Sequence, residues 1–154
     1  EAASAGDADL LETTGYPLSR LYQKLNALNA KEALVVLDAG FTGAGPRSAS
    51  PKNARTPIEK LDMGTRDMGG VVALLAASDG ETVGVLEGKR HGALTHSFLK
   101  GLNDEALGAD GIVTIKTLFR YVRSKVQEAA RSENRVQTPQ LFTGSLGESD
   151  RRLR

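Results

Sequence analysis

Two carboxylates follow apolar runs, and their position decides which chemistry the sequence allows. Asp38 comes directly after residues 33–37 (ALVVL), and Asp79 comes shortly after residues 71–76 (VVALLA). Each run is too short for a helix and is typical of a strand covered on both faces in a parallel sheet. Ligands collect beyond the carboxyl ends of such strands, so carboxylates there could select a cation. The simpler alternative is that Asp38 and Asp79 cap turns or accept backbone N–H bonds.

The glycine-rich stretch after Asp38 does not fit a phosphate-binding loop. Gly40 and Gly45 have the spacing of the glycines in G-x-x-x-x-G-K-[ST], but Pro46 and Arg47 stand where Lys and Ser or Thr belong. Proline also removes an N–H that would cradle a phosphate. A phosphate-binding α/β domain is therefore disfavoured.

The two histidines, His91 and His96, are candidate bases or metal ligands. Their five-residue spacing does not place them on one helical face, which disfavours a shared metal. We expect them at the surface or at the start of a helix. The chain has no cysteine, so it has no thiol nucleophile, no disulfide and too few soft ligands for an ordinary structural zinc site.

Composition is that of one compact soluble domain. Of the 154 residues, 40% are hydrophobic and 25% are charged, and no apolar run approaches the roughly 18 residues that a membrane span needs. Twenty basic against nineteen acidic residues give a net charge of +1, which argues neither for nor against nucleic acid or an anionic membrane. We expect neither of them as a partner. The lack of cysteine and of a visible signal peptide favours the cytoplasm.

The elements that must position these residues follow from apolar spacing. Helical periodicity predicts helices from about Pro17 to Leu28, over 93–102, and over 114–126 with Thr114 as its N-cap. A short strand is expected to follow the loop at 137–140. Helices that alternate with buried strands indicate an α/β layered domain with a mostly parallel sheet.

Two segments have no periodic pattern. Residues 44–70 combine prolines and glycines with basic residues, which predicts a functional loop or a processing linker, with a plain surface insertion as the alternative. Its candidate cleavage points are Arg47, Lys52, Arg55, Lys60 and Arg66. The polar tail, residues 145–154, is expected to fray.

Several stretches together resemble the caspase-like cysteine peptidases of the bacterial, metacaspase and orthocaspase type. That family has a strand ending in Asp-Ala/Ser-Cys-Phe/His-Ser-Gly, and residues 34–43 (LVVLDAGFTG) match it except that Gly40 stands at the nucleophilic cysteine. The resemblance covers about residues 16–144. Three further stretches are similar to the family's Ala-Ser-rich segment, its His-Gly-x-Phe-Thr helix and its late Gln-x-Pro-x segment: 75–81 (LAASDGE), 91–102 (HGALTHSFLKGL) and 137–140 (QTPQ).

The resemblance implies a caspase-type three-layer sandwich over residues 1–154, with a mostly parallel sheet flanked by helices. In this family an upstream histidine activates the thiol, and backbone N–H groups hold the oxyanion. That histidine would precede Glu1, so the resemblance implies an N-terminal fragment of the same protein as a partner. His91 matches a second His-Gly of the family, not the catalytic one. If the first strands lie in that fragment, the chain alone exposes an apolar edge.

The resemblance also implies a substrate class. Members with aspartate two residues before the cysteine cleave after Arg or Lys, so Asp38 matches the floor of a pocket for a basic side chain. Asp79 would be its second acidic wall, because a carboxylate pair favours a cation. The loop at 44–70 matches the position where the two halves of such peptidases are separated. No cofactor or metal is implied, and dependence on calcium stays open.

Gly40 is the main departure from the family pattern, because a residue without a side chain cannot form an acyl-enzyme. One explanation is an inactivating substitution in the zymogen of a working cysteine endopeptidase. Another is a natural pseudo-peptidase that keeps the fold as a protein-binding or scaffolding module. The third is that the motif is wrongly assigned. Glu81 and Leu94 also differ from the family's usual Gln and Phe.

Overall fold

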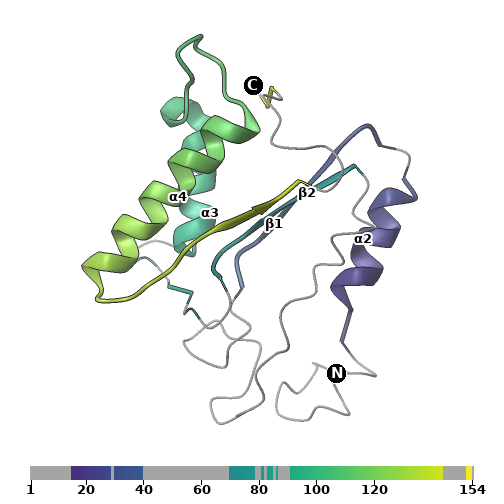
Figure 1. Ribbon diagram of the computed structural model, residues 1–154, viewed down its shortest axis with the longest axis horizontal. Helices are drawn as coiled ribbons and strands as arrows, with labels where there is room; N and C mark the ends of the chain where they lie inside the picture. Colours follow the sequence, from purple (N-terminus) through teal and green to yellow (C-terminus); the bar gives the residue numbers. More distant parts are fainter. Residues whose placement is uncertain are drawn as a thin grey trace.

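The computed structural model describes residues 15–28, 30–39, 70–78, 81, 83–84, 86, 91–143 and 152–153. In this part of the chain one helix is followed by two strands, then by two helices with a π-helical turn between them, and then by a third strand (Figure 1). Their order is α2 (Leu18–Asn26), β1 (Ala33–Leu37), β2 (Val71–Leu75), α3 (Ala93–Lys100), the π-helical turn η1 (Gly101–Glu105), α4 (Ile115–Ser132) and β3 (Gln140–Phe142).

The described strands form one mixed sheet in the order β1-β2-β3. β1 and β2 are parallel, with Leu37 opposite Leu75, whereas β3 is antiparallel to β2 and places Gln140 opposite Leu75. The ends of β1 and β2 and the start of β3 therefore meet at one edge, which we call the carboxyl edge. We predicted a mostly parallel sheet, but only one of the two described pairings is parallel. The other is antiparallel because the chain enters β3 from the carboxyl edge.

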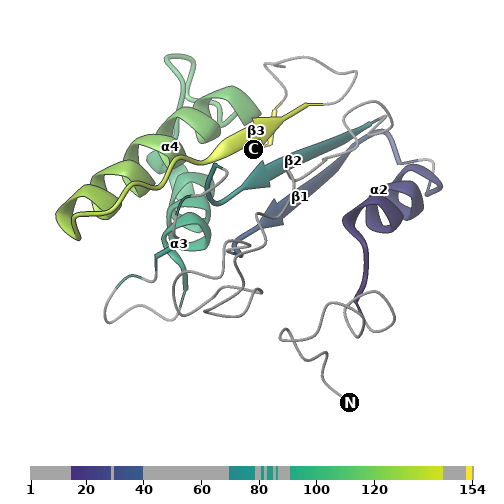
Figure 2. The same ribbon diagram turned by 60° about the horizontal axis from the view of Figure 1, so that its bottom comes forward.

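The helices lie on both faces of the sheet, so this part of the chain has three layers (Figure 2). Leu74 and Ala76 pack into the cluster formed with α3 and α4, which we call the α3–α4 face. Ala73 and Leu75 pack into a smaller cluster around Tyr22, which we call the α2 face. Alternate residues of β2 thus supply both cores, as expected for a central strand. The predicted α/β class is confirmed, and the caspase-type topology stays a prediction.

Helix α4 has the N-terminal cap and the buried apolar stripe that its sequence predicts. The Thr114 hydroxyl accepts the backbone N–H of Thr117, and the Thr117 hydroxyl accepts the backbone N–H of Thr114, which completes a capping box. Its apolar stripe is buried against the rest of the α3–α4 face, while the intervening basic residues are exposed. The buried residues of this stripe are Ile115, Leu118, Val122, Val126 and Ala130. The predicted helix and its N-cap are confirmed.

Helix α3 ends at Lys100, two residues before the predicted end. Gly101 begins η1 and packs so closely on α4 that a Cβ there would lie 2.4 Å from Leu118 Cδ1. The chain leaves the turn through Asp104, whose φ is +71°. Close packing and a widened turn, neither visible in the apolar spacing, thus end the helix early.

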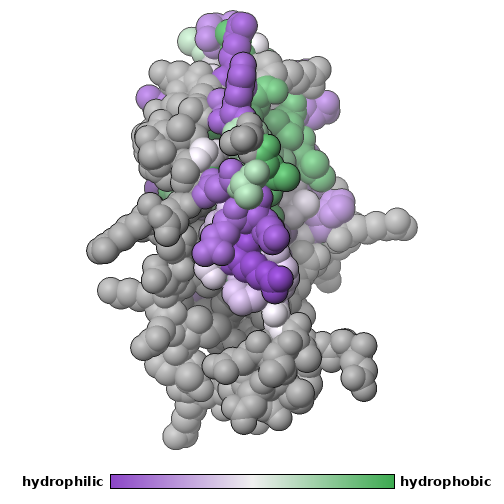
Figure 3. All heavy atoms as spheres, turned by 90° about the vertical axis from the view of Figure 1, so that its right-hand side faces the viewer, coloured by the Kyte–Doolittle hydropathy of each residue, from purple (hydrophilic) through white to green (hydrophobic). Residues whose placement is uncertain are grey.

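The two parallel strands have different environments. Every residue of β2 is buried, and Val72 is only 1% exposed. No residue of β1 is fully buried, and Leu34 is 37% exposed. β1 is nevertheless covered on both faces, as expected, because Val36 packs against the core of the α3–α4 face and Val35 and Leu37 pack against that of the α2 face. Among the described residues, a strand pairs with only one of its two sides. On the side of the molecule where α2 lies, Figure 3 shows a hydrophobic area next to hydrophilic atoms.

Of the tail that was expected to fray, residues 145–154, the structure describes Arg152 and Leu153, and these two residues are held in place. Arg152 forms an antiparallel bridge with Thr114, and the Leu153 N–H donates to the Val113 carbonyl oxygen at 2.8 Å. Leu153 also packs against the core of the α3–α4 face. Leu153 is an apolar residue within a charged sequence, and this half-buried contact holds it in place. The loop at 44–69, with its five basic residues, lies outside the described residues.

Candidate functional site

Asp38 links the end of β1 to the first turn of α3. Its Oδ2 accepts the Thr95 backbone N–H at 3.2 Å and the Thr95 hydroxyl at 2.6 Å. The first N–H groups of a helix have no partner within the helix, so Asp38 caps α3 from a different element.

Gly92 allows this contact because it has no side chain. A Cβ at this position would lie 2.2 Å from Asp38 Oδ2 and 2.5 Å from Oδ1. Real Cβ atoms do not come so close, so a side chain at position 92 would displace the carboxylate. The glycine of the His91-Gly92 pair therefore leaves the space that the Asp38 carboxylate occupies.

Together with the hydrogen bonds between Thr95 and Asp38, the hydrogen bonds at the carboxyl edge form a closed circuit. From α3, the Ala93 N–H donates to the Gly84 carbonyl oxygen at 3.2 Å. The Gly84 N–H donates to Gln137 Oε1 at 3.0 Å, and Gln137 Nε2 donates to the Ala76 carbonyl oxygen at 3.0 Å. The Ala76 N–H then donates to the Leu37 carbonyl oxygen at 3.0 Å, next to Asp38. Gln137 thus connects the residue after β2 to Gly84, which in turn contacts the start of α3.

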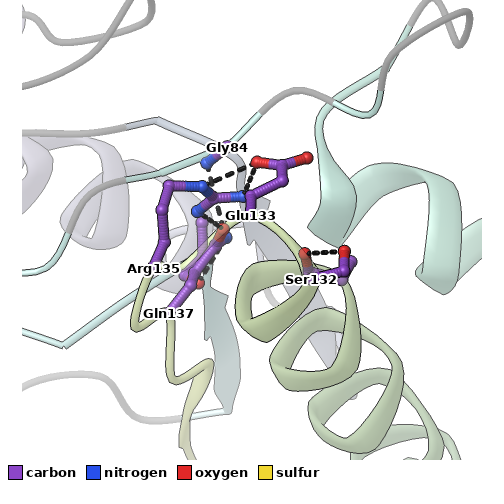
Figure 4. Close-up of polar contacts among 7 residues, drawn as sticks. Gly84, Ser132, Glu133, Arg135 and Gln137 are labelled. Carbon is purple, nitrogen blue, oxygen red and sulfur yellow. Dashed lines mark hydrogen bonds and ion pairs between the residues drawn. The ribbon is translucent and has the colours of Figure 1, made fainter.

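An arginine supports this buried glutamine (Figure 4). Gln137 is 1% exposed, and its Oε1 also accepts Arg135 Nη1 at 3.1 Å. The Arg135 guanidinium forms an ion pair with Glu133, with Nη2 2.7 Å from Oε2. A Cβ on Gly84 would lie 1.8 Å from Arg135 Nη2, so this close approach requires glycine at position 84.

A second polar cluster joins the end of β2 to the start of β3. Glu81 Oε2 accepts the backbone N–H groups of Ser78 and Thr138, at 3.0 and 2.5 Å, and Glu81 Oε1 accepts the Thr138 hydroxyl at 2.9 Å. The Ser78 hydroxyl accepts Gln140 Nε2 at 2.6 Å and donates to the Thr138 carbonyl oxygen at 3.3 Å. Neither partner of Ser78 is a base, so this hydroxyl is not arranged as an activated nucleophile.

The predicted site residues have different outcomes. Asp38 lies at the carboxyl edge and accepts a backbone N–H, as the simpler interpretation of its position predicts. Gly40 and Asp79 lie outside the described residues, so the nucleophile position and the acidic pair stay predictions. His91 is exposed just before α3, as expected, whereas His96 lies within α3 and is half-buried.

Sequence reasoning did not assign roles to Thr95, Glu81 and Gln137 at this edge. A signal was present for Thr95, because the third residue of a helix has a free N–H that a distant carboxylate can accept. The described residues contain no group of His, Cys, Asp and Glu that could hold a metal ion. In the same part of the chain, no helix is both long enough and apolar enough to cross a bilayer.

Comparisons with known proteins add no family to this description. No family model matches the chain, and no curated protein or solved structure is significantly similar to it.

Proposed function

We propose that the chain is the C-terminal part of a caspase-like cysteine endopeptidase domain that cleaves after Arg or Lys and is inactive in this form. The observation that supports the proposal best is the position of Asp38, a carboxylate at the carboxyl end of a strand that runs parallel to its neighbour. In α/β sheets this is where ligand sites form. In the proposal Asp38 receives the basic side chain of the substrate, with Asp79 as the second wall.

In an active parent protein, a cysteine at position 40 would act as the nucleophile. An upstream histidine takes the thiol proton, and the thiolate attacks the carbonyl carbon after the basic residue. Backbone N–H groups hold the oxyanion until the histidine gives its proton to the leaving amine, and water then hydrolyses the acyl-enzyme to the carboxylic acid and the free thiol. Gly40 cannot begin this sequence, which is why the proposal describes the present chain as inactive.

The proposal includes a partner, an N-terminal fragment of the same protein that carries the histidine. The exposed side of β1 supports this part, because a five-residue apolar strand with one unpaired side among the described residues can accept another strand. A strand added there would cover Leu34 and give β1 the environment that β2 already has.

A natural pseudo-peptidase that binds proteins is the second candidate, and the state of Asp38 favours it. Oδ2 already accepts two hydrogen bonds from Thr95, and Oδ1 is buried. A carboxylate held in this way supports the fold without any substrate. Together with Gly40, this arrangement is compatible with a module that has kept its architecture and lost its chemistry.

The deciding experiment uses the parent protein with its upstream segment and the Gly40→Cys substitution. It is assayed on peptides with Arg, Lys or Asp at the cleaved position, with and without calcium and a thiol alkylator. We expect alkylator-sensitive cleavage after Arg or Lys only. Gly40→Ala is the matched control, because it adds a side chain without a nucleophile and should stay inactive.

A further substitution separates the two candidates. Asp38→Asn in the Gly40→Cys protein should abolish cleavage after basic residues, while the protein stays folded because asparagine also caps helices. A folded Gly40→Cys protein that cleaves none of the peptides would refute the peptidase proposal and favour the pseudo-peptidase.

A further inference from the structure

We propose that Thr95 controls the access of a cationic ligand to the Asp38 carboxylate. This inference rests on the proposed function, in which Asp38 receives a basic side chain. It starts from two contacts: the Thr95 backbone N–H and hydroxyl both donate to Asp38 Oδ2, at 3.2 and 2.6 Å. The same residue therefore occupies the oxygen that a ligand would need.

The carboxylate is closed in its present arrangement. Oδ2 has two donors from Thr95, and Oδ1 has almost no surface exposed to solvent. A guanidinium binds a carboxylate best through two parallel N–H···O bonds, which need both oxygens. A ligand of this kind must therefore compete with at least one of the Thr95 donors.

The hydroxyl is the donor that can give way. Its hydrogen rotates about the C–O bond, whereas the backbone N–H is fixed by the first turn of α3. Gly92, at the start of the same helix, lets the carboxylate lie flat against α3. Thr95 and Gly92 together hold Asp38 against the helix, and release of the hydroxyl would remove one of the two Thr95 donors from Oδ2.

This role predicts opposite effects on stability and on binding. Thr95→Val keeps the shape of the side chain and the backbone N–H but removes the hydroxyl donor. The variant should unfold at a lower temperature, because a hydrogen bond to an ionised group is lost. It should also bind a cation more tightly, by about tenfold, because the ligand no longer displaces that bond. A purely structural role for Thr95 would weaken both properties.

The test uses the full chain and N-acetyl-arginine amide as the probe, with binding measured by calorimetry or by NMR titration. The variants are Thr95→Val, Thr95→Ala, Thr95→Ser and Asp38→Asn, each checked for folding by circular dichroism. We expect about tenfold tighter binding for Thr95→Val or Thr95→Ala, wild-type affinity for Thr95→Ser, which restores a hydroxyl, and no binding for Asp38→Asn.

The outcomes separate this inference from the function on which it rests. Equal affinity of the wild type and Thr95→Val, with binding lost in Asp38→Asn, would overturn the role of Thr95 and leave the Asp38 pocket standing. Unchanged affinity in Asp38→Asn would overturn the pocket, and the role of Thr95 with it. Folded Thr95→Val and Thr95→Ala proteins that bind no probe at millimolar concentration would also overturn the role of Thr95.

Discussion

The two faces of the sheet are built from alternate residues of β2, yet they are packed very differently. On the α3–α4 face, Leu74 and Ala76 join a core that includes Leu94, Val122 and other fully buried residues from two helices. On the α2 face, the buried core consists of Tyr22, Val71, Ala73 and Leu75. The difference indicates that the α3–α4 face supplies most of the stability of the described fold.

The faces also differ in how their helices begin and in their polar contacts. Helix α4 starts with a capping box at Thr114, whereas α2 starts at Pro17 with no side-chain cap. Among the described residues, the buried polar side chains are Ser97, Thr114 and Gln137, which belong to α3, α4 and the segments flanking α4. The α2 face has a smaller buried core and a helix without a side-chain cap. A further segment packed on this face would therefore bury more apolar surface than one packed on the α3–α4 face.

Leu74 and Leu75 provide the sharpest test, because they are neighbours of the same type that point to opposite faces. Leu→Ala substitutions in cores cost about 2–5 kcal/mol, more where the surroundings cannot collapse. We expect Leu74→Ala to lower the free energy of unfolding by about 4 kcal/mol and Leu75→Ala by about 2 kcal/mol. Urea unfolding followed by circular dichroism measures both, and equal losses would contradict the difference between the faces.

Gln137 should have the next largest effect. Gln137→Met keeps the volume of the side chain but leaves the Gly84 N–H and the Ala76 carbonyl without their partner. The expected loss in the free energy of unfolding is about 2–3 kcal/mol, because buried polar groups would be unsatisfied. Gln140→Met is the matched control on the same segment. Gln140 is half-buried and donates to Ser78 Oγ, so its loss should be about 1 kcal/mol. A smaller loss for Gln137→Met than for its control would refute the importance of the circuit.

The sequence predicted the elements whose signals are local. The apolar runs at 33–37 and 71–75 are strands, and the stripe after Thr114 is a helix with the expected cap. Periodicity and capping depend on residues a few positions apart, so they can be read from a single sequence. Asp38 at the end of β1 was predicted for the same reason.

The features that sequence reasoning did not provide depend on distant partners. The hydrogen bonds from Thr95 to Asp38 and from Gln137 to Ala76 join residues far apart in the chain, and no local pattern predicts such pairs. The exposure of β1 is also non-local, because an apolar run has the same pattern whether one or two strands pair with it. The early end of α3 depends on the contact of Gly101 with Leu118.

The helix starts allow a smaller test of the two faces. Thr114→Ala removes the cap of α4 and should cost about 1 kcal/mol in the free energy of unfolding. Pro17→Asp gives α2 a side-chain cap that it lacks and should add up to about 0.5 kcal/mol, since the loss of proline offsets part of the gain. Thermal unfolding of both variants measures the two shifts. An increase in stability for Thr114→Ala would contradict the cap of α4. A decrease in stability for Pro17→Asp as large as that for Thr114→Ala would contradict the lack of a cap on α2.

The smallest expected effect concerns one tyrosine on each face. Burial, followed by its hydrogen bond to Glu105, raises the pKa of Tyr121 from 10.0 to about 12, and the same bond lowers the pKa of Glu105. Burial also raises the pKa of Tyr22 on the α2 face. Above pH 10, both phenols are thus more protonated in the folded than in the unfolded protein. Each phenol therefore contributes to the free energy of unfolding, and this contribution is fully present below pH 10. For Tyr121, it is lost as the pH rises towards about 12.

Glu105→Gln separates the two causes of these pKa shifts. We expect it to lower the pKa of Tyr121, because the charged partner is removed, and to leave the pKa of Tyr22 unchanged, because burial, and not Glu105, raises it. Ultraviolet absorbance of the phenolates during an alkaline titration measures both, with Tyr121→Phe and Tyr22→Phe to assign the two transitions. An unchanged Tyr121 transition would mean that burial alone raises the pKa of this phenol. The tyrosines of the two faces would then have the same cause for their shifts, which would contradict a role for the Glu105 hydrogen bond.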